Sequence, residues 1–129
     1  MIEVKSYRDL KVWNQAMDLV IMCYQLTTKF PKTEVYGLTS QIQRAAVSIP
    51  ANIAEGKGRY HLGEYIHHLS IANGSLNELE THLLIAERLS YLGNSELHPV
   101  FELTQKVGKM LNTLIKTLKE RQKKLTYKT

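Results

Sequence analysis

The stretch Gln41-Ile-Gln-Arg-Ala-Ala-Val-Ser-Ile-Pro-Ala-Asn-Ile-Ala-Glu-Gly-Lys-Gly-Arg59 decides the fold that we predict for this chain. At helical spacing, its apolar and polar side chains fall on separate stripes. The apolar stripe consists of Leu38, Ile42, Ala46, Ile49 and Ile53. The polar stripe consists of Gln41, Arg44, Ser48, Asn52, Glu55 and Arg59. A third, narrower face of small residues indicates a helix packed on more than one side; it holds Ala45, Val47, Ala51 and Ala54.

Pro50 stands in the middle of this predicted helix. Proline lacks a backbone donor and crowds the carbonyl four residues earlier, so we expect a kink or break there unless packing holds the helix. Gly56 and Gly58 follow the last apolar positions, and glycine favours the left-handed conformation that ends many helices. We therefore predict a kinked helix over about residues 36–56.

Three further helices are predicted around this one, over about residues 9–28, 61–90 and 95–124. Ser6 or Asp9 can cap the first, and Asn94 or Ser95 can cap the last. Helices of this length joined by short turns pack antiparallel. The predicted fold class is all-α, an antiparallel up-down-up-down four-helix bundle. With 129 residues and 43% hydrophobic content, residues 1–129 are expected to form a single domain.

Two features of the flanking helices lead to further expectations. The small residues Ser70, Gly74 and Ser75 are expected to leave room for the alanine-rich part of the 36–56 helix, so Gly74→Leu should lower the melting temperature. The first helix carries more apolar surface than a lone bundle needs, which indicates deep burial or a subunit contact. Its two stripes are Leu10, Trp13, Met17, Val20 and Tyr24, and Val12, Ala16, Leu19, Cys23 and Leu26.

Composition restricts the location and the redox chemistry. The N-terminal residues lack the apolar core of a signal peptide, and the longest apolar run, residues 19–24, is far too short to span a bilayer. We expect a cytoplasmic protein without a membrane partner. Cys23 is the single cysteine, which excludes an intramolecular disulfide and a multi-cysteine metal site, and it is expected to be a small apolar core residue.

The stretch that decides the fold also resembles a known family. Residues 37–42, 44–56 and 58–59, with the core Ser-Ile-Pro-Ala-Asn-Ile-Ala-Glu-Gly at 48–56, are similar to the signature of bacterial four-helix-bundle proteins encoded by intervening sequences in large-subunit ribosomal RNA genes, often labelled ribosomal-protein-like. More distantly, the chain resembles the accessory variability protein of diversity-generating retroelements. Residues 10–13, 30–31, 71–72 and 74–80 fit as well. The resemblance implies a homo-oligomer, a pentameric barrel, of unsettled role, with the structural motif Ser48, Pro50, Asn52, Glu55 and Gly56.

No catalytic or metal constellation is predicted, so we expect a protein that is not an enzyme and that needs no cofactor. Gly56-Lys57-Gly58 lacks the spacing of a phosphate loop. Glu64 and His67 have the Glu-x-x-His spacing of di-iron bundles, but there is no second copy. Helical-bundle ribonucleases have an arginine that is followed by a histidine four to six residues later, and no pair here has that spacing. Arg59 is followed by His61 and His67, and Arg88 only by His98.

Charge gives the strongest functional signal. The net charge is +5, and residues 105–129 hold eight basic residues against one acid. Such a strip can neutralise phosphates, which predicts binding of nucleic acid, RNA more than DNA. The alternatives are a solvated face, or a protein-interaction scaffold without nucleic-acid contact. The predicted contacts are Lys109, Lys116, Arg121 and Lys124 first, and Arg44 and Arg59 second. Glu55 and Arg59 are also spaced for an ion pair, and with Asn52 they could line a subunit junction.

Overall fold

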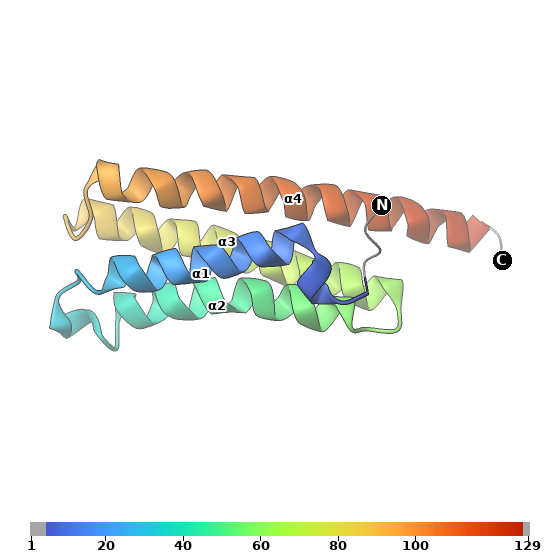
Figure 1. Cartoon of the computed structure of the whole chain (residues 1–129), viewed down its shortest axis with the longest axis horizontal. Helices are drawn as coiled ribbons and strands as arrows, with labels where there is room; N and C mark the ends of the chain where they lie inside the picture. Colours follow the sequence, from blue (N-terminus) through green and yellow to red (C-terminus); the bar gives the residue numbers. More distant parts are fainter. Residues whose placement is uncertain (1–4, 128–129) are drawn as a thin grey trace.

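Four helices make up most of residues 5–127, which are the residues described by the computed structural model (Figure 1). α1 spans Lys11–Thr27, α2 spans Leu38–Lys57, α3 spans Leu62–Arg88 and α4 spans Asn94–Tyr127. Two short 3-10 helices, η1 (Tyr7–Asp9) and η2 (Lys32–Glu34), precede α1 and α2. Within the described range there is no strand, and the predicted all-α class is confirmed.

Successive helices run antiparallel and pack side by side, and α4 closes the bundle against α1 (Figure 1). α2 and α4 therefore lie diagonally across the core from each other. The α1–α2 and α3–α4 turns share one end of the bundle, and α4 runs past its neighbours at the other end. This is the predicted up-down-up-down arrangement.

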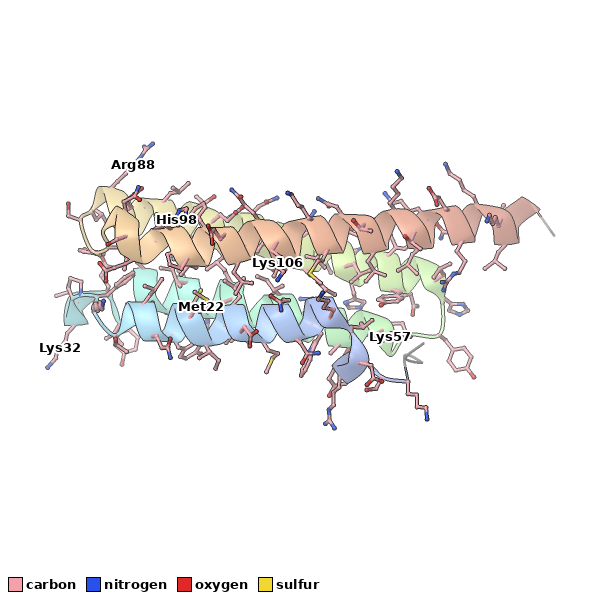
Figure 2. The ribbon with its side chains drawn as sticks, turned by 45° about the horizontal axis from the view of Figure 1, so that its top comes forward. Met22, Lys32, Lys57, Arg88, His98 and Lys106 are labelled. Carbon is pink, nitrogen blue, oxygen red and sulfur yellow. The ribbon has the colours of Figure 1, made fainter. Side chains whose placement is uncertain are left out.

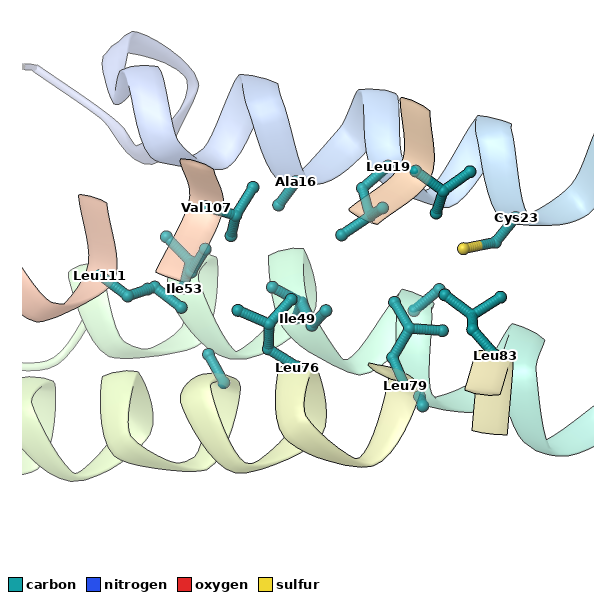
Figure 3. Packing of buried hydrophobic residues seen from close by; sticks show 14 of the residues in the cluster. Ala16, Leu19, Cys23, Ile49, Ile53, Leu76, Leu79, Leu83, Val107 and Leu111 are labelled. Atoms are coloured by element: carbon teal, nitrogen blue, oxygen red, sulfur yellow. The ribbon is translucent and has the colours of Figure 1, made fainter. Parts of the chain in front are cut away.

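The predicted apolar stripes form the core (Figure 3). Ile42, Ile49 and Ile53 of α2 are fully buried against side chains from the other three helices. Each buried side chain of this size contributes roughly 1.5–3 kcal/mol relative to exposure. Cys23 belongs to this core as predicted, and burial raises the pKa of its thiol to about 12, so it stays a protonated, apolar filler. On α1, the stripe that contains Cys23 is the buried one.

The helix bounds differ from the prediction mainly at the chain ends. Ser6 and Asp9 cap η1 and not α1: the Ser6 hydroxyl accepts the Arg8 N–H, and Asp9 accepts the Ser6 N–H in a capping box. α1 therefore begins at Lys11. At the other end, α4 continues to Tyr127, past the predicted end near residue 124. The bounds of α2 and α3 lie within two residues of their predicted positions.

One of the two predictions about helix breakers in α2 needs correction. At Pro50, which is buried, α2 continues without a break, so packing holds the helix together there. Gly58 caps α2 with φ −80°, a right-handed conformation, and the predicted left-handed glycine is wrong. Ser90 is the one non-glycine residue of the described chain with positive φ, at 64°. It ends α3 in a Schellman arrangement, in which Tyr91 N–H bonds the Ala86 carbonyl.

The expectation for Gly74 is wrong, and a different glycine has the proposed role. Gly74 is exposed, and a Cβ built on it meets nothing within 4 Å. A Cβ on Gly56 of α2 would lie 2.8 Å from the His68 Cβ and 3.2 Å from the Tyr65 carbonyl oxygen. The close approach of α2 and α3 thus depends on Gly56. Periodicity identified the two faces, but it could not tell which backbone comes nearest.

The two turns at the shared end of the bundle are linked by side chains. Glu34 accepts a hydrogen bond from the Tyr91 hydroxyl at 2.8 Å and another from the Leu38 N–H at 3.1 Å. The Leu38 bond, and then the Tyr91 bond, lower the pKa of Glu34, and the same hydroxyl contact raises the pKa of Tyr91. Lys29 and Glu96 form an ion pair across the same end.

Candidate nucleic-acid interface

The outer side of α4 carries two neighbouring rows of polar side chains. Positions seven residues apart lie within about 20° of each other around a helix. Lys109, Lys116 and Lys123 make one row on this spacing, and successive members stand about 10 Å apart along the axis. The second row lies on the side toward α3. Together the exposed members of both rows form the α4 polar face: Gln105, Lys109, Asn112, Lys116, Lys119 and Lys123.

The positive charge of α4 is not neutralised within the described chain. Residues 105–127 contain seven basic residues and a single acid, Glu120. No lysine or arginine of α4 belongs to an ion pair between residues 5 and 127. Figure 2 shows side chains with nitrogen tips projecting from α4 into solvent. The face is thus open to an anionic partner.

The structure places the predicted α4 contacts on different sides of the helix. Lys109 and Lys116 lie on the α4 polar face. Arg121 lies off this face; burial raises the pKa of Tyr65 in the first turn of α3, and the charge of Arg121 lowers it to a smaller extent. Lys124 shares a side with Lys106, which faces α1 (Figure 2). Lys123, which was not among the predicted contacts, completes the row, and its seven-residue spacing from Lys116 is the signal that could have identified it.

The two arginines predicted as secondary contacts lie away from α4. Arg44 is exposed on α2, which lies diagonally across the bundle, and Arg59 is exposed just beyond the end of α2. Arg44 lines a hollow between α1 and α2. Arg59 forms the predicted ion pair with Glu55 one turn earlier, and both side chains are about half exposed. Neither arginine joins the α4 polar face within one protomer.

The residues that carry the family resemblance make a contact between α2 and α3. Asn52 donates from Nδ2 to the Ser48 carbonyl oxygen at 2.9 Å and to Ser48 Oγ at 3.0 Å. Its Oδ1 therefore faces His68 Nδ1, at 3.2 Å, and that nitrogen carries the hydrogen. Ser48 Oγ also bonds Ser75 Oγ at 2.8 Å. This network, which we call the α2–α3 polar network, is half buried and joins the two helices next to Gly56.

The structure brings no set of metal ligands together in residues 5–127. No group of three or more histidine, cysteine, aspartate or glutamate side chains lies close enough there to hold an ion. Glu64 and His67 are exposed, and the His67 ring stacks edge-on against His68 at 5.9 Å. Among the described helices, none is long and apolar enough to cross a membrane.

Comparison with known proteins gives a family and a fold. The profile of a family described as 23S rRNA-intervening sequence protein matches residues 8–113. A solved structure from Bacteroides thetaiotaomicron, described as a protein of unknown function from the S23 ribosomal protein family, aligns with a TM-score of 0.74 and 23% identity. The alignment covers 81% of this chain and 98% of that one, and at this identity it shows the shared fold. No curated protein matches the chain.

Proposed function

Since the chain belongs to the 23S rRNA-intervening sequence protein family, we propose that it is a non-catalytic protein that binds nucleic acid, RNA rather than DNA, through the α4 polar face. The observation that carries this proposal is the row of three exposed, unpaired lysines on a segment with one acid. Lysines that neutralise phosphates release condensed counterions, which makes binding favourable and salt-dependent.

The proposal includes a closed homo-oligomer, with the pentamer that the resemblance implies. Support comes from apolar side chains of α1 and α2 that the protomer leaves between 39% and 56% exposed: Met17, Ile21, Tyr24 and Val47. A contact through this surface, the α1–α2 apolar patch, leaves α4 free because α4 lies diagonally across from α2. A ring would then repeat the α4 polar face, and several weak phosphate contacts would act together.

A salt titration tests the proposal directly. We expect the purified protein to bind RNA with a log–log salt slope of several units, and the variant Lys109→Glu/Lys116→Glu/Lys123→Glu to lose this binding. The matched control is Lys5→Glu/Lys32→Glu/Arg88→Glu, which changes the net charge equally at exposed positions away from the α4 polar face. Equal loss in both variants would show that net charge, and not this face, attracts RNA.

The second candidate function is a protein-interaction scaffold, and the α1–α2 apolar patch favours it. If this patch binds another protein, Ile21→Lys abolishes that complex and the α4 charge reversals leave it intact. If the patch holds the homo-oligomer, the same variant yields monomers in light scattering. Absence of RNA and DNA binding at about 50 mM salt would favour the scaffold over the nucleic-acid function.

A further inference from the structure

A polar groove runs between α3 and α4 beside the lysine row. Its volume is about 410 Å³, and four carboxamide side chains line it: Asn73 and Asn77 from α3, and Gln105 and Asn112 from α4. Lys109 stands at its margin and also belongs to the α4 polar face. Carboxamides both donate and accept hydrogen bonds, so a groove rich in them suits a ligand with mixed donors and acceptors.

The remaining residues of the groove keep it open and limit its negative charge. Glu80 is the one acid that lines it, and Glu80 accepts a hydrogen bond from the Thr104 hydroxyl at 2.7 Å. Gly108 forms part of the floor, and a Cβ there would come within 3.3 Å of the Leu76 side chain. The groove is therefore a preformed space lined mainly by uncharged polar side chains, with one carboxylate, Glu80, and one ammonium group, Lys109.

Two of the amides are bonded to each other across the groove. Asn73 Nδ2 donates to Asn112 Oδ1 at 3.2 Å, which holds the two side chains together. Asn73 Oδ1 and Asn112 Nδ2 take no part in this bond, and neither has a protein partner within residues 5–127. The pair therefore still offers one acceptor and one donor to a ligand, and the Watson–Crick and Hoogsteen edges of bases carry groups that can bond both.

From this arrangement we infer that the α3–α4 groove binds an unpaired RNA strand, with its phosphates on Lys109 and Lys116 and its base edges and 2′-hydroxyls on the amides. The inference deepens the proposed function and rests on it. Base edges are free for such contacts in single strands, whereas the major groove of duplex RNA is too narrow for side chains. The 2′-hydroxyl, both donor and acceptor, distinguishes RNA from DNA at an amide-lined site.

Three probes of one sequence test this inference: a single-stranded RNA of about 20 nucleotides, its duplex with the complementary RNA, and the corresponding single-stranded DNA. We expect the protein to bind the single-stranded RNA most tightly. Asn73→Ala/Asn112→Ala should lower that affinity roughly tenfold, since two hydrogen bonds are lost, and should leave the salt slope unchanged because the phosphate contacts remain. The matched control, Gln25→Ala/Gln41→Ala, removes two exposed amides of α1 and α2 and should bind as the unmodified protein does.

The outcomes separate this inference from the proposed function. The groove is overturned if Asn73→Ala/Asn112→Ala binds single-stranded RNA as tightly as the unmodified protein does. It is also overturned if the unmodified protein binds the duplex RNA or the single-stranded DNA as tightly as the single-stranded RNA. In both cases the salt-dependent lysine contacts stand. If the unmodified protein binds none of the three probes, the groove and the proposed nucleic-acid function are both overturned. Because Asn112 is exposed, the single variant Asn112→Ala serves as the second test should the double variant fold poorly, and it should weaken single-stranded RNA binding about threefold.

Discussion

The α2–α3 polar network and the α4 polar face are two polar surfaces of one bundle, and they differ in how much the rest of the chain depends on them. Ser48, Asn52, His68 and Ser75 bond one another between two helices that approach closely at Gly56. The lysines of α4 have no ion-pair partner in residues 5–127 and lie outside the core. The polar residues of the α2–α3 polar network determine how two helices pack, whereas the lysines of the α4 polar face are available to bind a ligand.

This difference predicts that the two surfaces respond to substitution in opposite ways. Changes in the α2–α3 polar network should alter the free energy of unfolding and leave nucleic-acid affinity unchanged at temperatures where the protein is folded. Changes on the α4 polar face should do the reverse. A similarity to a family signature therefore points here to a packing motif, and the candidate binding residues lie elsewhere in the chain.

The largest effect on stability is expected at Gly56. Gly56→Ala forces a methyl group against the His68 side chain and the Tyr65 carbonyl oxygen, which lie within 3.2 Å of the new Cβ. We expect overpacking to lower the free energy of unfolding by about 1–3 kcal/mol, measured by urea denaturation.

Gly74→Ala is the matched control for this substitution. It lies in the interior of α3, where a Cβ meets nothing within 4 Å, so the better helix propensity of alanine should raise stability by up to about 1 kcal/mol. If both glycine variants were stabilised, the close approach of α2 and α3 at Gly56 would be refuted.

The next largest effect is expected at Asn52, the centre of the α2–α3 polar network. Asn52→Ala leaves His68 Nδ1 and Ser48 Oγ without the partner that joins them, which should cost about 1–3 kcal/mol because the groups are half buried. A double-mutant cycle with His68→Ala in urea denaturation measures the coupling. Additive effects of the two substitutions would mean that the hydrogen bond contributes nothing.

On the α4 polar face, Lys116→Ala should change affinity and not stability. Loss of one phosphate contact lowers the log–log salt slope for RNA by about 1. The free energy of unfolding, measured by thermal denaturation, should change by less than about 0.5 kcal/mol because the side chain is exposed. The control is Lys32→Ala, at an exposed position at the other end of the bundle from Lys116 and outside the α4 polar face, which should leave the slope unchanged. A destabilised but fully binding Lys116 variant would reverse the assignment of the two surfaces.

The smallest effect is expected at the Glu55–Arg59 ion pair, which is exposed although it belongs to the family-like stretch. Glu55→Gln should reduce stability by roughly 0.2–0.5 kcal/mol at low salt, and the difference should vanish near 1 M salt. A larger, salt-independent loss would indicate that the pair is covered in the proposed oligomer, as expected if these residues line a subunit junction.

The fold followed from the sequence because its signal is local. Apolar positions such as Ile42, Ile49 and Ile53 recur at helical spacing, and their burial is what that spacing predicts. What could not be predicted depends on the register between helices. The sequence does not show which of Gly56 and Gly74 lies at the contact between two helices. It also does not show the hydrogen bond from Asn73 to Asn112, which joins residues 39 positions apart.

The candidate contacts on α4 were partly recoverable for a related reason. Counting charges identified the helix, but not the side of the helix on which each charge lies. Lys123 joins Lys109 and Lys116 through its seven-residue spacing. Arg121, one of the predicted contacts, is two residues from Lys123 and therefore lies on another side of the helix. Angular position around the axis decides this difference, and it could have been applied to the sequence alone.

The unequal ends of the bundle have a consequence for its motions. Glu34, Tyr91, Lys29 and Glu96 tie both interhelical turns together at one end, whereas the last turns of α4 project past the other helices (Figure 1). Backbone amides of those last turns should exchange with deuterium fastest, because fraying from a free helix end needs no global unfolding. A polyanion lying along the lysine row would span the anchored and the fraying parts of α4. Recognition and local ordering of the helix would then be one event, with protection spreading toward the C-terminus as the ligand binds.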